Sequence, residues 1–261
     1  MTETIISSVL LNNTLKHFND ILNHKSNEFD KDLFIKKSIP ILFFGDIKKY
    51  YENDFKIVTA AINPSDREFK LNKHDKRFST KFRFEDYDNS IESLEVSYSN
   101  YFKKNPYSWF GKKNNKHYNV GFKPVLNGMG YCFYPNKTNL KAVLHTDICS
   151  PIATRKKWRD ISRFMKDELI KDGFILWKEL INEIKPNLII LSISKDILRM
   201  LNPVFIENIY QKSSKYEVNL YKVNINGYKT NLIWASSLVT PFQPFSNKYE
   251  IGEIIKNRLL N

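Results

Sequence analysis

Residues 56–69 read Lys-Ile-Val-Thr-Ala-Ala-Ile-Asn-Pro-Ser-Asp-Arg-Glu-Phe. The first half of this stretch is an apolar run of small and β-branched residues without turn formers, which is typical of a buried parallel strand. Asn-Pro-Ser ends the run, and Ser65 and Glu68 then have the spacing of a capping box, which predicts a helix after the turn. In an open α/β sheet, ligands bind where the carboxyl end of a strand meets the next helix. Asn63 is therefore a candidate for the mouth of a pocket, although an asparagine here would also serve simply to shape the turn.

The composition of the chain indicates a folded and strongly basic protein. Its 261 residues are 42% hydrophobic and 14% aromatic, which fits a chain with a substantial core. We expect a single domain over residues 1–261, with residues 1–40 as a helical extension packed on it, although the length also allows two domains. The formal net charge of +13 favours a polyanionic partner such as nucleic acid, because phosphates attract positive charge without regard to sequence. Anionic lipid would attract the same charge.

Several classes of protein are disfavoured by what the sequence lacks. No apolar run approaches the roughly 20 residues of a membrane-spanning helix, and the N-terminus lacks the pattern of a signal peptide, so we expect a cytoplasmic protein without a membrane partner. Cys132 and Cys149 are too few for a disulfide framework or an iron-sulfur cluster. The five histidines lack the partners of the usual zinc motifs. We therefore predict no metal and no cofactor.

Hydrophobic periodicity predicts helices that alternate with strands. Helical spacing is found at 5–22, 90–102, 158–173, 174–185 and 247–260. Gly173 is expected to end the third of these helices, and the fourth is expected to end before Pro186. Besides 56–62, strand patterns are found at 140–148, 187–194 and 230–234, and Asn226-Gly227 predicts a hairpin turn. The short apolar run 41–45 fits either an extra strand or a pocket wall. This alternation predicts an α/β fold with right-handed parallel crossovers.

A second polar segment ends the predicted strand 140–148. Residues 144–155 read Leu-His-Thr-Asp-Ile-Cys-Ser-Pro-Ile-Ala-Thr-Arg. The motif Ile62-Asn63-Pro64-Ser65 resembles the first motif of the uracil-DNA glycosylase superfamily, particularly of its branches with Asn in that motif. Residues 144–155 resemble the superfamily's second-strand segment, and the two follow each other along the chain in the same order as in the superfamily. The resemblance extends over roughly residues 55–245. It implies a three-layer α/β/α sandwich with a central, mainly parallel sheet, and a base site formed by Asn63 with Ile62, Pro64 and Ser65.

Asp147 takes the position at which the superfamily carries an Asn that reads the Watson-Crick edge of the flipped base. An amide both donates and accepts hydrogen bonds, which suits uracil, whereas an ionised carboxylate only accepts and would favour the exocyclic amino group of a cytosine-type base. By the same comparison His145 is a further candidate for base binding. The alternative for Asp147 is that it caps a turn or the following helix.

Aromatic and basic residues near these motifs are candidates for the remaining contacts to DNA. In the superfamily an aromatic ring between the two segments stacks on the base, and Trp109 and Phe110 are our candidates, with Phe82 and Phe133 in reserve; packing in the core is the alternative for each ring. Arg155, Lys156 and Lys157 follow the second segment and are expected to hold phosphates. The basic and aromatic stretch 70–83 also suits a phosphate-tracking groove, or else a solvated loop.

The segment 235–245 follows the last predicted strand, where the superfamily usually carries a His-Pro-Ser or Asn-Pro-Ser motif. This chain has no His there, and Ser236 and Ser237 hold the nearest matching positions. The departure puts His-assisted stabilisation of the leaving base in doubt. Phe242 and Gln243, between two prolines, fit a stiff wedge that contacts DNA and separates a base step.

These features predict a monofunctional DNA glycosylase that hydrolyses the N-glycosidic bond of a flipped base. Asn63 would orient the attacking water, and no lysine is placed as a Schiff-base nucleophile, so strand cleavage is not expected. Asp147 favours a cytosine derivative as the base. The resemblance to superfamily members that act in bacterial defence implies glucosylated hydroxymethylcytosine in phage DNA. Uracil excision in repair, a non-catalytic nucleic-acid-binding module on the same fold, and a hydrolase of free nucleosides are the alternatives.

Overall fold

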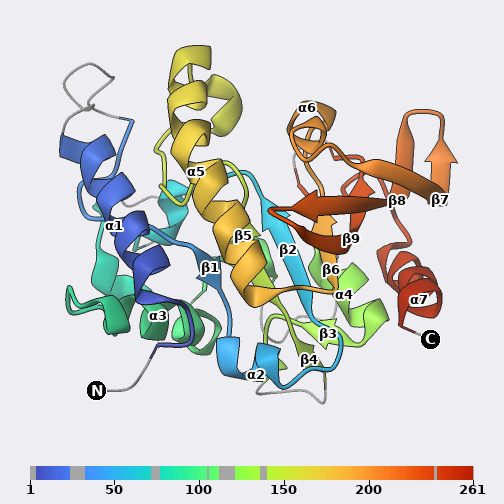
Figure 1. Cartoon of the computed structure of the whole chain (residues 1–261), viewed down its shortest axis with the longest axis horizontal. Helices are drawn as coiled ribbons and strands as arrows, with labels where there is room; N and C mark the ends of the chain where they lie inside the picture. Colours follow the sequence, from blue (N-terminus) through green and yellow to red (C-terminus); the bar gives the residue numbers. More distant parts are fainter. Residues whose placement is uncertain are drawn as a thin grey trace. The chain divides into compact units, whose positions relative to one another are not determined.

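The computed structural model describes residues 4–23, 33–71, 77–104, 106–111, 121–135, 140–237 and 240–260 (Figure 1). The helices are α1 Ser8–Asn23, α2 Ile47–Tyr51, α3 Ile91–Asn100, α4 Lys123–Met129, α5 Arg163–Ile184, α6 Lys195–Arg199 and α7 Lys248–Leu259. The strands are β1 Phe43–Phe44, β2 Ile57–Ala61, β3 Tyr131–Cys132, β4 Lys141–Ala142, β5 Leu144–Asp147, β6 Leu188–Leu191, β7 Val204–Ser213, β8 Tyr216–Ile225 and β9 Tyr228–Ala235. None of the helices in the described residues has the length and apolar character needed to cross a membrane.

Seven strands form a mixed, mostly parallel sheet in the order β1-β5-β2-β6-β9-β8-β7. β6 pairs in parallel with β2 and with β9, so that Leu188 lies opposite both Ile57 and Asn231. β8 is antiparallel to β9 and to β7, and the β8–β9 connection turns at Asn226 and Gly227, whose φ angles of 51° and 89° lie in the left-handed region. The α/β class and the Asn-Gly hairpin are therefore confirmed.

Two segments differ from the strand pattern in the sequence. The predicted strand 140–148 is divided into β4 and β5, and β4 pairs in parallel with β3 in a separate two-stranded sheet. The run 41–45, for which two interpretations were open, contains the two-residue strand β1.

Contacts within the chain group it into two compact units, whereas the sequence led us to expect one domain. The first unit comprises residues 1–44, 62–106 and 146–184, and the second comprises residues 45–61, 107–145 and 185–261. Each unit is thus assembled from three separate segments. The predicted N-terminal extension, residues 1–40, belongs to the first unit.

Helix α1 belongs to the core of the first unit. It lies along α5, and His17 approaches Asp172 of that helix at 3.6 Å (Figure 1). The Glu95 carboxylate accepts hydrogen bonds from the backbone nitrogens of Ile5 and Ile6 at 3.0 and 2.6 Å, which holds the start of the chain on α3. The apolar side chains buried together in this region are Phe18, Ile21, Leu33, Phe34, Ile152, Ile161, Met165 and Leu169.

Helix α5 runs without a break from Arg163 to Ile184, so the prediction that it ends at Gly173 is wrong. The reason lies in packing: a Cβ atom at Gly173 would stand 2.3 Å from the Cys149 carbonyl oxygen and 2.7 Å from the Ser150 Cα. Glycine is needed here because backbone passes very close to the helix. Trp177, on the same helix, donates from Nε1 to Thr146 Oγ1 at 3.0 Å, which fixes α5 against β5.

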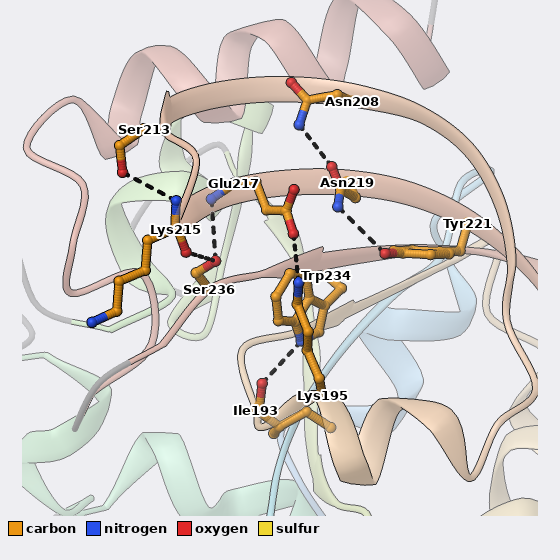
Figure 2. Close-up of polar contacts among 10 residues, drawn as sticks. All are labelled: Ile193, Lys195, Asn208, Ser213, Lys215, Glu217, Asn219, Tyr221, Trp234 and Ser236. Atoms are coloured by element: carbon orange, nitrogen blue, oxygen red, sulfur yellow. Dashed lines mark hydrogen bonds and ion pairs between the residues drawn. The ribbon is translucent and has the colours of Figure 1, made fainter.

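The second unit contains the β6-β9-β8-β7 part of the sheet and a polar network across it (Figure 2). Lys195, the first residue of α6, forms an ion pair with Glu217 of β8 at 2.9 Å, and its ammonium lies 5.2 Å from the centre of the Trp234 ring. Trp234 in turn donates from Nε1 to the Ile193 carbonyl at 2.9 Å. These contacts join the end of β6 to β8 and β9.

Candidate functional site

The Asn63 side chain ties two loops of the first unit together. Its amide nitrogen donates to Thr154 Oγ1 at 2.9 Å, to the Pro64 carbonyl at 3.1 Å and to the Ile152 carbonyl at 3.4 Å. Thr154 Oγ1 donates its own proton to the Lys156 carbonyl at 2.9 Å, so toward Asn63 the hydroxyl can only accept. The Asn63 amide therefore turns its nitrogen toward Thr154, and its Oδ1 atom remains as the acceptor for a hydrogen bond from another group.

The loop after β2 and the loop after β5 run side by side. The Cys149 nitrogen donates to the Ile62 carbonyl at 2.9 Å, and Ser65 pairs with Thr154 in a parallel bridge. Ser65 also caps a three-residue 3₁₀ helix, Asp66–Glu68, by accepting from the Arg67 nitrogen at 3.2 Å. The Ser65 hydrogen bond of the expected capping box is therefore present, but the helix is a single short turn. The Glu68 side chain accepts a hydrogen bond from Tyr101 instead of completing the capping box.

Glu68 and Asp147 are two buried carboxyl groups in the same unit, with exposed fractions of 4% and 6%. The Tyr101 hydroxyl donates a hydrogen bond to Glu68 Oε2. Burial raises the pKa of Glu68 to about 7, although the Tyr101 hydrogen bond and the Arg83 guanidinium oppose the change. The pKa of Asp147 is raised well above its usual value, by burial first and then by the Glu68 charge.

The raised pKa favours the protonated form of Asp147, whereas the sequence argument assumed an ionised carboxylate. The physical reason is that a buried carboxylate beside a second acidic group loses hydration without gaining a compensating cation. A protonated carboxyl donates through its O–H and accepts through its carbonyl oxygen. Like the Asn with which it was compared, a protonated Asp147 would both donate and accept hydrogen bonds, although it has one donor where an amide has two.

A basic and aromatic cluster adjoins the Asn63 loop. The Phe78 ring has the Arg155 guanidinium 5.1 Å and the Lys70 ammonium 5.5 Å from its centre. Arg155 is the residue after Thr154, and Lys70 is held by Asp66 at 2.6 Å. Lys156 and Lys157 are exposed next to them. The structure therefore brings Arg155 together with the predicted basic stretch 70–83, of which residues 72–76 lie outside the described residues.

His145 and the candidate aromatic residues pack together in the second unit. His145 is 2% exposed, its Nδ1 is 2.8 Å from Thr59 Oγ1, and burial lowers its pKa to about 3, so it is neutral. The rings of Trp109 and Phe110 lie 5.2 and 5.0 Å from its ring. Phe110 is buried and Trp109 is partly exposed, so Trp109 is the more accessible of the two predicted stacking residues. Phe133, held in reserve, also packs on His145, whereas Phe82 lies under the Arg83 guanidinium in the first unit.

The four predicted DNA contacts in 235–245 differ in their accessibility. Ser236 is buried, and its hydroxyl accepts from the Glu217 nitrogen at 3.1 Å and donates to the Lys215 carbonyl at 3.3 Å (Figure 2). Phe242 is fully buried against Phe122 and Phe245, so its ring would have to leave this packing to contact DNA. Ser237 is partly exposed and Gln243 is exposed. In this conformation only Ser237 and Gln243 present side chains to solvent.

Sequence reasoning missed Glu68 and Thr154 as members of the site. Glu68 was taken for a helix cap, and its actual partner, Tyr101, is 33 residues away. No local pattern marks such a pairing. Thr154 immediately precedes the predicted phosphate contact Arg155, and its Oγ gives it the capacity to orient an amide, which was the available signal.

No family model, curated protein or solved structure matches this chain. Among the described residues, no group of three or more His, Cys, Asp or Glu side chains has an arrangement that could hold a metal ion.

Proposed function

We propose that this protein is a monofunctional DNA glycosylase that hydrolyses the N-glycosidic bond of a base turned out of the DNA helix. The observation that supports it most is the tie from Asn63 to Thr154, which joins two loops beside the buried carboxyl groups of Glu68 and Asp147. A three-layer α/β/α arrangement of the uracil-DNA glycosylase type belongs to the same proposal.

Asn63 acts in this proposal by orienting water. Its amide cannot take a proton, but Oδ1 accepts a hydrogen bond from the water that attacks C1′ of the sugar. The water oxygen bonds to C1′ as the bond from C1′ to the base nitrogen breaks. The sugar passes through an oxocarbenium-like state, which the negative phosphates of the DNA strand stabilise. The departing base takes up one proton from Asp147, and the attacking water releases one proton to solvent, from which Asp147 is protonated again.

Asp147 reads the edge of the extruded base and supplies its proton. A protonated carboxyl pairs with cytosine by donating to N3 and accepting from the exocyclic amino group, and with uracil by donating to O4 and accepting from N3–H. The ring nitrogen of cytosine is more basic than the carbonyl oxygen of uracil, so proton transfer from Asp147 assists the departure of cytosine more. We therefore propose a cytosine derivative, such as a glucosylated hydroxymethylcytosine in phage DNA, ahead of uracil.

The direct test is base excision from duplexes that carry uracil, hydroxymethylcytosine or glucosylated hydroxymethylcytosine. We expect alkali-labile sites in the modified-cytosine duplex and no strand break before alkali treatment. Asn63→Ala should lower turnover by about 10²-fold or more while leaving DNA affinity nearly unchanged, because it removes an interaction of the reacting water. Asn224→Ala, at an exposed position of β8, is the matched control.

Two results would contradict the proposal. One is the absence of alkali-labile sites in every duplex, and the other is wild-type turnover in Asn63→Ala. Cleavage of the uracil duplex alone would keep a glycosylase but remove the argument for cytosine.

A non-catalytic DNA-binding module is the second candidate, and one observation favours it. The donors of the Asn63 amide are all directed at protein atoms of the two loops, which is also what a purely structural asparagine would do. A binding module predicts that the wild-type protein retains every base while binding DNA with the salt dependence of a phosphate-contacting protein.

A further inference from the structure

A groove in the first unit lies outside the site described above. It has a volume of about 590 Å³, which is within the range of roughly 300–1,000 Å³ that is usual for ligand sites. Four segments form it: the end of α1, residues 36–39, residues 79–81 and residues 87–89. Leu15, Phe18 and Ile39 supply its apolar lining, and the rest of the wall is polar.

Among the residues that the structure describes, the polar wall of the groove is rich in hydrogen-bond donors and contains no carboxylate. Three lysines line it, Lys36, Lys37 and Lys81, with hydroxyl and amide side chains from Ser38, Ser79, Thr80, Tyr87, Asn19 and Asn89. Lys36 and Lys37 are exposed, and neither forms an ion pair with any residue that the structure describes. A groove of this composition favours an anion with several oxygen acceptors.

Hydrogen bonds between the segments hold the wall in place. Thr80 Oγ1 donates to the Lys37 carbonyl at 2.8 Å, and Ser38 Oγ donates to the Ile35 carbonyl at 2.6 Å. The Lys81 ammonium donates to the carbonyl of Tyr87 and, at 3.4 Å, to that of Glu85. Because these contacts join three of the four segments, the cationic side chains start from a fixed backbone.

The groove wall directly follows the basic and aromatic cluster beside Asn63 along the chain. Phe78, which lies between Arg155 and Lys70, is followed directly by Ser79, Thr80 and Lys81 of the groove wall. The backbone of this segment is anchored to the Asn63 side of the unit, because Lys70 pairs with Phe78 and the Ser79 nitrogen donates to the Phe69 carbonyl at 2.8 Å. The Phe78 segment therefore connects the cluster around Arg155 with the groove wall.

We infer that this groove binds the phosphodiester backbone of the DNA strand that flanks the extruded nucleotide. Lys36 and Lys37 neutralise phosphates, and Lys81 with its neighbouring hydroxyls positions the strand between them. That the strand is DNA rests on the proposed function. The preference for a phosphodiester backbone rests on the lysines and hydroxyl groups that line the groove. Helix α1 and residues 36–39, which the sequence marked only as an extension, thereby become part of the binding surface.

The test compares DNA binding by the double variant Lys36→Gln/Lys37→Gln with binding by the wild-type protein. Titration of a labelled duplex at several salt concentrations should show a loss of affinity of roughly tenfold at low salt, and a salt slope about 2 lower in magnitude, or about 1 per lysine. Lys222→Gln/Lys229→Gln, which removes the same charge from exposed positions of β8 and β9, should leave both quantities near the wild-type values. Lys36→Arg/Lys37→Arg should restore affinity, because charge is kept.

The inference is overturned if the groove variant binds DNA like the wild-type protein, or if the control variant loses as much. It is also overturned if a free mononucleotide occupies the groove and the groove variant abolishes that binding without weakening DNA binding. The proposed function is tested independently, by measuring base excision by the wild-type protein on the same duplexes. If no base is excised, the glycosylase proposal fails, but the result on DNA binding by the groove still holds.

Discussion

Glu68 shows how one side chain acquires chemistry from its surroundings. It is 4% exposed, it accepts a hydrogen bond from Tyr101, and Arg83 and Asp66 act on it electrostatically. Burial outweighs the favourable partners, so its pKa rises from the ordinary 4.5 to about 7. Together with the raised pKa of Asp147, this produces a pair of acidic groups whose protonated forms are favoured by burial. Proton donation to a departing base requires such a group.

The raised pKa of Glu68 predicts how stability depends on pH. Because the pKa is higher in the folded than in the unfolded protein, the folded state binds the proton more tightly, and this contribution to stability is present in full below pH 4.5. It is lost as pH rises to about 7 and beyond, by an amount of roughly 3 kcal/mol. Denaturant unfolding at pH 5 and pH 8 should show this loss in the wild-type protein and a smaller one in Glu68→Gln.

The exposed Glu92→Gln variant of α3 is the control for this experiment and should retain the wild-type pH dependence. Part of the dependence should persist in Glu68→Gln, because the raised pKa of Asp147 acts in the same direction. An unchanged dependence in Glu68→Gln would mean that Glu68 is ionised in the folded protein.

At the scale of secondary-structure elements, the packing of α5 against the segment after β5 positions the site. Gly173 brings the helix into contact with Cys149 and Ser150, and Trp177 anchors it to Thr146. The same segment continues to Thr154 and Arg155, which hold Asn63 and face Phe78. The position of the loop that carries these residues therefore depends on a glycine in the middle of a helix.

Gly173→Ala should destabilise the protein by about 1–3 kcal/mol, since the added Cβ would meet the Cys149 carbonyl at 2.3 Å. The sign of the change in the free energy of unfolding distinguishes close packing from helix propensity. Where packing does not intervene, alanine stabilises a helix relative to glycine by about 1 kcal/mol. Thermal or urea unfolding measures the change. Lys171→Ala, at an exposed position two residues earlier, should be neutral or nearly so. A stabilised Gly173→Ala protein would refute the close packing.

At the scale of the whole molecule, the net charge of +13 should dominate binding to DNA. There are six candidate phosphate contacts in two groups. The site supplies Arg155, Lys156 and Lys157, and the groove supplies Lys36, Lys37 and Lys81. A protein with about six such contacts loses affinity on the order of 10³-fold between 50 and 200 mM salt. Equilibrium titrations with a duplex of random sequence should show a dependence of this size.

The same measurement separates a DNA glycosylase from a hydrolase of free nucleosides. A free nucleoside carries no phosphate, so its hydrolysis should change little over this range of salt. Base release from DNA at subsaturating protein should instead fall with salt in parallel with binding. Salt-independent release from both substrates would contradict a role for the basic surface.

The sequence by itself determined the features that depend on local pattern. The apolar runs of β2 and β6 and the Asn226-Gly227 turn were predictable, because strand burial and left-handed φ angles leave signatures within a few residues. Asn63 and Asp147 could be singled out for the same reason, since both stand at the ends of such runs.

Only the tertiary structure decided what these residues face. Four features arise between segments far apart in the chain: the continuity of α5 through Gly173, the burial of Glu68 against Tyr101, the raised pKa of Asp147 and the hydrogen bond from Asn63 to Thr154. Burial and close packing are set by such partners, and the pKa of a carboxyl group follows from its burial. A local pattern can nominate a side chain, but the dielectric and the hydrogen bonds around it come from the folded protein.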